Sequence, residues 1–153
     1  AVGVDDGLDL VQAKDTLLRY VRQLGEAGLR VAAVVEPALE QVRAAHRAGL
    51  HAVELHAGAY AVARGFAERS AALGKIRDAA RTAAKLGLGV SVGHDLDLRS
   101  LEPVARIPDV LEVTVGHGIC AAAMVVGLDR AVRDVLDRLA EARRRAPRAG
   151  RPG

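Results

Sequence analysis

The sequence contains little cysteine, few aromatic residues and no long apolar run. Its single cysteine, Cys120, can form neither a disulfide within the chain nor a zinc site of cysteine ligands, so the cytoplasm is the expected location. No apolar run approaches the roughly 20 residues of a membrane span, and no secretion leader or membrane partner is expected. Three aromatic residues, Tyr20, Tyr60 and Phe66, are too few for a typical stacking surface, so nucleic acid is not an expected partner.

The excess positive charge lies at one end of the chain. The net charge is +3, with 22 basic and 19 acidic residues. Five arginines lie within residues 143–153, which contain no acidic residue, and without them the acidic residues are in excess. We therefore predict that residues 143–153, which are rich in arginine, proline and glycine, form a disordered tail. Residues 1–142 have the length of one domain.

Four short runs rich in β-branched residues alternate with helical patterns. The predicted strands are 30–35, 52–56, 88–92 and 110–115, and the predicted helices are about 10–28, 36–49, 63–86, 98–105 and 120–143. A glycine followed by leucine stands at three helix-to-strand boundaries, at residues 28–29, 49–50 and 87–88. A left-handed glycine can end each helix there. This repetition predicts βα units and a parallel sheet.

The predicted strands have one polar and one apolar face, which favours a barrel. In the second run, Glu54 and His56 alternate with Val53 and Leu55. Central strands of an open parallel sheet are apolar on both faces, whereas a polar face can line a barrel lumen. No GxGxxG or GxxxxGK[ST] motif supports a Rossmann or P-loop fold. We predict an α/β fold of four βα units, equal to half of a (β/α)8 TIM barrel.

Residues that can take part in catalysis or binding end or follow each predicted strand, where catalytic groups of such barrels gather. They are Glu36, Glu54 with His56, Gly93-His94-Asp95, and Gly116-His117-Gly118. Histidine can transfer protons near neutral pH, but either loop histidine could equally be structural. Glu54 could serve a reaction or form a salt bridge in the lumen. These side chains lack the HExxH spacing, and no metal is expected.

The last of these motifs predicts a phosphate site. Gly116 and Gly118 allow a ligand close to the backbone, and His117 can add a charged donor. A helix predicted to begin near Cys120 would present free N–H groups to an anion. Loops after the last two strands commonly bind phosphate in this fold. Cys120 itself is more typical of a small core residue than of a reactive thiol.

Four segments occur in an informative order: 7–10 (GLDL), 53–61 (VELHAGAYA), 86–94 (LGLGVSVGH) and 107–117 (IPDVLEVTVGH). From about residue 7 to residue 143, the chain closely resembles the C-terminal part of the pyridoxine 5′-phosphate synthase family. That resemblance implies a (β/α)8 barrel, a homo-octamer and no cofactor. It also implies condensation of 1-deoxy-D-xylulose 5-phosphate with 3-amino-2-oxopropyl phosphate to pyridoxine 5′-phosphate, phosphate and water.

The resemblance also implies roles for individual residues. His94 matches the proton donor, and Glu54 matches the residue that stabilises the transition state. Asp95, Gly116 and His117 match positions that bind the aminoketone phosphate. The family has glycine where Asp95 stands, and a carboxylate there disfavours phosphate unless the side chain turns away.

Two further departures concern activity. Residues 3–9 (GVDDGLD) lack a threonine that contacts deoxyxylulose phosphate in the family, and the motifs of the first barrel half, which supply general bases, have no counterpart. The expected function is therefore a pyridoxine 5′-phosphate synthase whose C-terminal half is inactive alone. The alternative is a non-catalytic half-barrel that acts as an assembly or phosphate-binding module.

Overall fold

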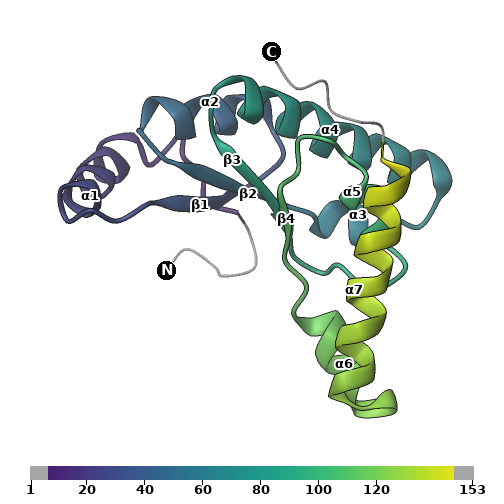
Figure 1. Cartoon of the computed structure of the whole chain (residues 1–153). Coiled ribbons are helices and arrows are strands. Elements are labelled where there is room, and N and C mark those ends of the chain that lie inside the picture. The colour runs from purple at the N-terminus through teal and green to yellow at the C-terminus, as the bar shows by residue number, and fades with distance from the viewer. Residues whose placement is uncertain (1–6, 147–153) are drawn as a thin grey trace.

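The computed structural model describes residues 7–146, which form a parallel sheet with helices against it (Figure 1). The elements in chain order are α1 (Lys14–Glu26), β1 (Ala32–Val35), α2 (Leu39–Arg47), β2 (Ala52–His56), α3 (Gly58–Val62), α4 (Phe66–Lys85), β3 (Gly89–Gly93), α5 (Leu101–Ala105), β4 (Glu112–Val113), α6 (His117–Val126) and α7 (Leu128–Arg145). The alternation of strands and helices predicted from the sequence is confirmed.

The four strands pair in chain order, β1-β2-β3-β4, and all neighbours are parallel. Glu54 of β2 lies beside Ser91 of β3, and Ser91 lies beside Glu112 of β4. The last strand is shorter than the predicted run 110–115. Backbone N–H groups of Leu111 and Thr114 nevertheless donate to β3 carbonyls at 2.9 Å, so the pairing extends one residue beyond β4 at each end.

One face of the sheet forms the core with α2 and α4, which lie on the same side of the strands (Figure 1). Fully buried residues on the strand side include Val35, Val53, Leu55 and Val92. The facing side of α4 consists of Ile76 and three alanines at positions 79, 80 and 83, all fully buried. Small side chains at helical spacing let α4 approach the strands closely. Burial of these apolar faces is the main driving force for this half of the fold.

The other face of the sheet is polar and open. Val34 is 41% exposed, and Glu54 and Ser91 are only partly buried while Glu112 is exposed. The alternation predicted for residues 52–56 is therefore confirmed for 52–55, with Val53 and Leu55 on the core side, whereas His56 at the strand end is buried as well. An open sheet with one polar face is consistent with part of a barrel wall, in which such a face would line the lumen.

The three glycine–leucine boundaries share one backbone geometry. Gly28, Gly49 and Gly87 have φ values of 76°, 79° and 79°. After each glycine, the leucine N–H donates to the carbonyl five residues earlier, at 3.0–3.1 Å. These two features define the Schellman ending of a helix. The predicted left-handed helix ends are confirmed.

Several helix boundaries differ from the predictions. The helices predicted to begin at about residues 10, 36, 63 and 98 begin three to four residues later, as α1, α2, α4 and α5, and α3 was not predicted. The helix predicted at 120–143 is instead two helices, α6 and α7, separated by Gly127 with φ 84°. In Figure 1, α6 and the start of α7 project away from the sheet beyond β4.

The end of α7 also differs from the predicted tail boundary. The helix continues to Arg145, so the first three residues of the predicted tail 143–153 are helical. The Arg143 guanidinium donates to the Val110 carbonyl, and Arg145 pairs with Glu141 one turn earlier at 2.6 Å. Residues 147–153 lie outside the described residues. No helix within 7–146 is long and apolar enough to cross a membrane.

Candidate active site at the carboxyl ends of the strands

The parallel strands bring the predicted residues to one edge of the sheet. Glu36 follows β1, His56 ends β2, His94 follows β3, and Gly116 caps the start of α6 after β4. Because all four strands run in the same direction, their carboxyl ends lie on the same side. The predicted catalytic and binding residues therefore lie at one edge of the sheet. They form two groups, one of Glu54 and the two strand-end histidines and one that lines a separate cavity.

Glu54 lies on the polar face and reaches across β3. Its Oε2 accepts a hydrogen bond from the Thr114 hydroxyl at 2.9 Å. The carboxylate passes over Gly93, where an added Cβ would lie 2.6 Å from Glu54 Oε1 and 2.9 Å from Thr114 Cβ. Gly93 is therefore required for this contact. Among residues 7–146, Glu54 forms no ion pair. The salt bridge of Glu54 that the sequence allowed as an alternative is therefore not observed among these residues.

His56 and His94 stack on each other at the strand ends. Their ring centroids are 4.0 Å apart with planes inclined by 32°. The His56 side chain is 9% exposed and the His94 side chain is 31% exposed. Gly58 begins α3 beneath this pair, and a Cβ there would lie 2.6 Å from His56 Cε1. The outer ring, His94, is thus accessible to a ligand, while His56 is its buried support.

The hydrogen bonds of His56 define its ring nitrogens. The Gly58 N–H donates to Nδ1 at 3.3 Å, which places the ring hydrogen of a neutral imidazole on Nε2. Nε2 is buried and forms no hydrogen bond within the described part of the chain. Glu36 Oε1 lies 3.5 Å from Nδ1 of the same ring. Buried polar atoms without partners are rare in proteins and call for an explanation such as a bound ligand or water.

His94 and Asp95 adopt an uncommon backbone conformation, with φ values of 78° and 54°. Non-glycine residues rarely occupy this left-handed region, although Asn, Asp and His do so more often than most. The turn directs the Asp95 carboxylate to 3.7 Å from His94 Nε2. The Asp95 carboxylate therefore lies beside the His94 ring.

The second group of predicted residues lines a cavity of about 410 Å³. Asp95, Asp97, Arg99 and His117 line it, together with Leu98 and small residues of the first turns of α6. The structure thus brings Asp95 and His117 together, as predicted, whereas Glu54 and His94 are not among its lining residues. Arg99 is a cation that the sequence reasoning missed, because its position in a turn gave no periodic signal.

Asp97 has a structural task in this cavity. Its Oδ1 accepts hydrogen bonds from the Arg99 and Ser100 N–H groups and from the Ser100 hydroxyl, at 2.8–2.9 Å. Burial favours the neutral form, but these hydrogen bonds and the Arg99 charge outweigh it and hold the pKa of Asp97 below its ordinary value of 3.8. Asp97 therefore stabilises the turn before α5.

The predicted phosphate loop is organised differently from the expectation. The helix begins at His117 rather than near Cys120, so His117 lies in its first turn. A Cβ at Gly118 would lie 2.7 Å from the Leu96 carbonyl oxygen, whereas no atom lies within 4 Å of a Cβ at Gly116. Gly118 therefore serves close packing against the turn at residues 96–97. Only Gly116 leaves the backbone open to a ligand in the way that was predicted.

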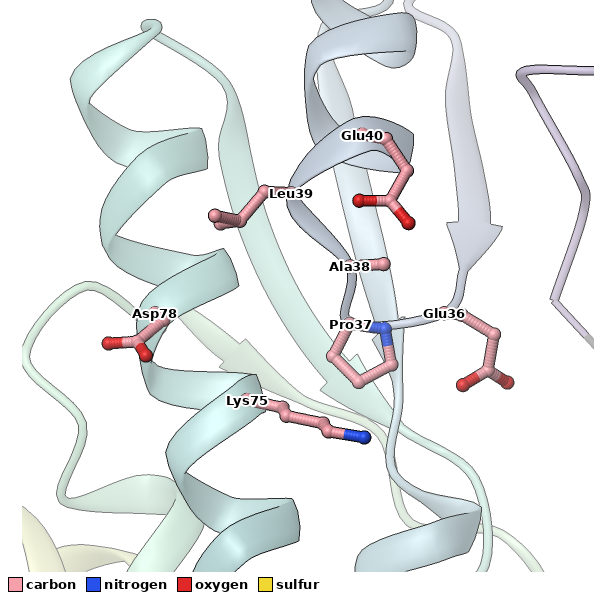
Figure 2. A pocket seen from close by; sticks show the side chains of 7 residues that line it. All are labelled: Glu36, Pro37, Ala38, Leu39, Glu40, Lys75 and Asp78. Atoms are coloured by element: carbon pink, nitrogen blue, oxygen red, sulfur yellow. The ribbon is translucent and has the colours of Figure 1, made fainter.

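Two further cavities lie beside Glu36. The larger, about 430 Å³, lies between the loop after β1 and α4 (Figure 2). In Figure 2, the Lys75 side chain extends from α4 and passes below Pro37 in the direction of Glu36. A second cavity of about 280 Å³ shares these three residues and adds His56. Within residues 7–146, no group of His, Cys, Asp and Glu side chains is arranged to hold a metal ion.

Comparison of the sequence with known proteins identifies related chains. The model of the family "Pyridoxal phosphate biosynthesis protein PdxJ" matches residues 1–141. The chain is 41% identical over 133 residues to pyridoxine 5′-phosphate synthase of Syntrophotalea carbinolica, covering 87% of this chain and 56% of the relative. It is 40% identical over 138 residues to the synthase of Magnetococcus marinus, covering 90% and 57%. The chain thus spans little more than half the length of these curated relatives.

A solved structure supports the fold. The crystal structure of the Amycolatopsis orientalis BexX/CysO complex matches with a TM-score of 0.56 at 18% identity. The match covers 99% of this chain and 57% of that chain. At this identity the likeness concerns the fold alone.

Proposed function

Because the chain belongs to the PdxJ family of pyridoxal phosphate biosynthesis proteins, we propose that it is the C-terminal half of a pyridoxine 5′-phosphate synthase. Its four βα units would then form half of a (β/α)8 barrel. The open polar face of the sheet supports this proposal, since the remaining strands would enclose it as the lumen. The coverage of 56–57% of the relatives' length is in agreement.

The proposed reaction condenses 1-deoxy-D-xylulose 5-phosphate with 3-amino-2-oxopropyl phosphate. The observation that carries it is the convergence of Glu54, His94 and the His117 cavity on one rim of the sheet. Such convergence at strand carboxyl ends is the usual position of an active site in this fold. Neither a cofactor nor a metal is part of the proposal.

In this proposal His94 donates a proton to the reacting substrate. Its side chain is partly exposed, so a substrate can reach it, and the His56 ring limits its orientation. The Asp95 carboxylate lies 3.7 Å from His94 Nε2, beside the ring that would donate the proton. A positioned proton donor of this kind contributes about 10²–10⁴-fold to a rate.

Glu54 stabilises positive charge that develops in the transition state. Thr114 fixes the carboxylate by its hydroxyl, so the negative charge is oriented before the substrate binds. Such preorganised charges need no rearrangement during the reaction, which is the source of their catalytic effect. Gly116 and His117, with Asp95, bind the aminoketone phosphate.

The chain alone is proposed to be inactive as a synthase. Its residues provide a proton donor but not the general bases of the first barrel half, each worth about 10²–10⁴-fold. We also propose that it forms homo-oligomers, because the edges of the sheet at β1 and β4 have no strand beside them within residues 7–146. Unpaired strand edges readily recruit further strands.

The test combines an activity measurement with a binding measurement. The purified chain is incubated with both substrates, and pyridoxine 5′-phosphate is quantified by its fluorescence after separation. No turnover is expected, whereas inorganic phosphate is expected to shift the NMR amide signals of Gly116, His117 and Gly118. Turnover at a rate normal for such synthases would refute the half-enzyme proposal. Shifts confined to the cavities beside Glu36 would refute the placement of the phosphate site.

The alternative, a non-catalytic half-barrel that serves as an assembly or phosphate-binding module, is favoured by one observation. Asp95 places a carboxylate, 50% exposed, at the position where the resemblance implies glycine. The half-enzyme and the binding module predict different turnover when an N-terminal half is added. Addition of the N-terminal half of the Syntrophotalea carbinolica synthase is expected to restore turnover if the site is catalytic. If the chain is only a binding module, the added half is not expected to restore turnover.

A further inference from the structure

The cavity between the turn at residues 94–99 and α6 combines both signs of charge. Asp95 and Asp97 contribute carboxylates, and Arg99 and His117 contribute basic groups. Within the described ranges, Arg99 and His117 form no ion pair, and Asp95 approaches only His94, at 3.7 Å. A cavity of about 410 Å³ is large enough for a small metabolite.

The two carboxylates are not equivalent. Asp97 Oδ1 accepts three hydrogen bonds from Arg99 and Ser100, which hold this side chain to the turn. Asp95 accepts no hydrogen bond within residues 7–146, and its side chain is 50% exposed. Asp95 is therefore the carboxylate of this cavity that is less engaged by the protein.

The charges favour a ligand that carries both signs over a simple ion. A phosphate dianion beside Arg99 and His117 would share the cavity with Asp95, whose like charge weakens its binding. A simple cation attracted to Asp95 would be repelled by Arg99. A zwitterion satisfies both ends, with its anionic group at Arg99 and His117 and its cationic group at Asp95.

We propose that Asp95 is a specificity-determining residue that binds the ammonium group of a small amino-bearing phosphate ester in this cavity. The inference rests on the proposed function, because it places the phosphate beside Gly116 and His117. It adds a charged partner for the amine at a position where the resemblance implies glycine. The ligand class is thus a short alkyl phosphate that carries a primary ammonium group.

The expected effect is moderate because Asp95 is half exposed. Ion pairs between exposed groups contribute about 0.2–1 kcal/mol, and the upper end of this range corresponds to about fivefold in affinity. The preference for an amino-bearing ester over an otherwise matched ester should therefore be about fivefold. Asp95→Asn should remove it, and asparagine tolerates the left-handed backbone at this position.

The test compares 2-aminoethyl phosphate with ethyl phosphate, which differs in lacking the ammonium group. Each ester is titrated into the whole chain at neutral pH, and the amide signals of Gly116 and His117 are followed by NMR. The parent protein should bind the amino ester about fivefold more tightly. Asp95→Asn should bind both esters equally. Glu26→Gln, an equal charge change on the exposed end of α1, should preserve the preference.

The outcomes separate this inference from the proposed function. Equal binding of both esters by the parent, or a preference that survives Asp95→Asn, would overturn the role of Asp95 and leave the phosphate site intact. If Asp95→Asn weakens both esters by the same factor, Asp95 acts only through His94 and the inference is again wrong. If neither ester shifts these signals, the phosphate site itself fails, and the inference fails with it.

Discussion

Replacement of Gly93 by alanine should break the contact between Glu54 and Thr114. The added methyl carbon would lie 2.6 Å from Glu54 Oε1 and 2.9 Å from Thr114 Cβ, closer than real contacts allow. The carboxylate can swing away, but only by giving up its 2.9 Å hydrogen bond to the Thr114 hydroxyl. Thr114 Cβ adjoins the backbone and cannot move independently of β4.

The cost can be estimated from these two effects. Overpacking costs about 1–3 kcal/mol, and loss of one hydrogen bond costs about 0.5–1.5 kcal/mol. Alanine in a strand recovers about 0.5–1 kcal/mol of chain entropy relative to glycine. We therefore expect the free energy of unfolding to fall by about 2 kcal/mol. With a urea dependence of about 2 kcal/mol/M, the unfolding midpoint should fall by about 1 M.

The assay is urea unfolding followed by circular dichroism, with Gly116→Ala as the matched control. No atom lies within 4 Å of a Cβ at Gly116, so the control adds a methyl group without a steric clash and should lower stability less than Gly93→Ala does. In a Glu54→Ala background, Gly93→Ala should lower the free energy of unfolding by about 1 kcal/mol less, because the Glu54 carboxylate no longer clashes with the added methyl group. If Gly93→Ala is as stable as Gly116→Ala, Glu54 does not cross β3 in the way described.

Two further predictions concern the turn between β3 and α5. Tyr60→Phe should lower the free energy of unfolding by about 1–2 kcal/mol, because the buried Tyr60 hydroxyl donates to the Ser100 carbonyl at 3.0 Å. Burial raises the pKa of Tyr60 above 10.0, so this tyrosine destabilises the folded chain progressively as pH rises past 10, and the phenylalanine variant should lose less stability there in urea melts. Asp97→Ala should cost about 1 kcal/mol near neutral pH through loss of its hydrogen bonds to Arg99 and Ser100. Since the pKa of Asp97 is lowered from 3.8, the difference from the parent should shrink as pH falls below that value, and a pH-independent difference in thermal melts would contradict this.

Local patterns in the sequence predicted the sheet well, because its determinants are local. The alternation of Glu54 with Val53 and Leu55 follows from the strand period of two, and the structure buries Val53 and Leu55 while it leaves Glu54 partly exposed. The left-handed glycines at the ends of α1, α2 and α4 follow from backbone sterics that few other residues satisfy. Both features depend on a few consecutive residues, so they are visible without knowledge of the tertiary structure.

The start of α6 could not be predicted in this way. Two glycines in Gly116-His117-Gly118 disfavour helix by propensity, yet the helix begins at His117. Gly118 is tolerated there because it packs on the Leu96 carbonyl. That contact joins segments 22 residues apart, about which local propensity carries no information. The same holds for Arg99, whose entry into the cavity depends on the turn that Asp97 stabilises.

The division at Gly127 was missed for a related reason. A continuous apolar and charged pattern over 120–143 suggests one helix, whereas Gly127 at φ 84° separates α6 from α7. Isolated glycines inside a helical pattern are often tolerated, so the sequence alone does not distinguish a tolerated glycine from a break. The ion pairs of α7, from Arg133 with Asp129 to Arg145 with Glu141, favour helix up to and beyond the predicted end at residue 143.

The packing of Gly118 has a consequence for the motion of the candidate site. Because its backbone lies directly against the Leu96 carbonyl, the first turn of α6 cannot slide toward the turn at residues 96–97, and the two walls of the cavity should move together. A ligand would then enter a preformed space, with no slow closing step before it is held. Binding should therefore appear as a single fast exchange process in relaxation experiments, without a component on the millisecond scale typical of lid closure.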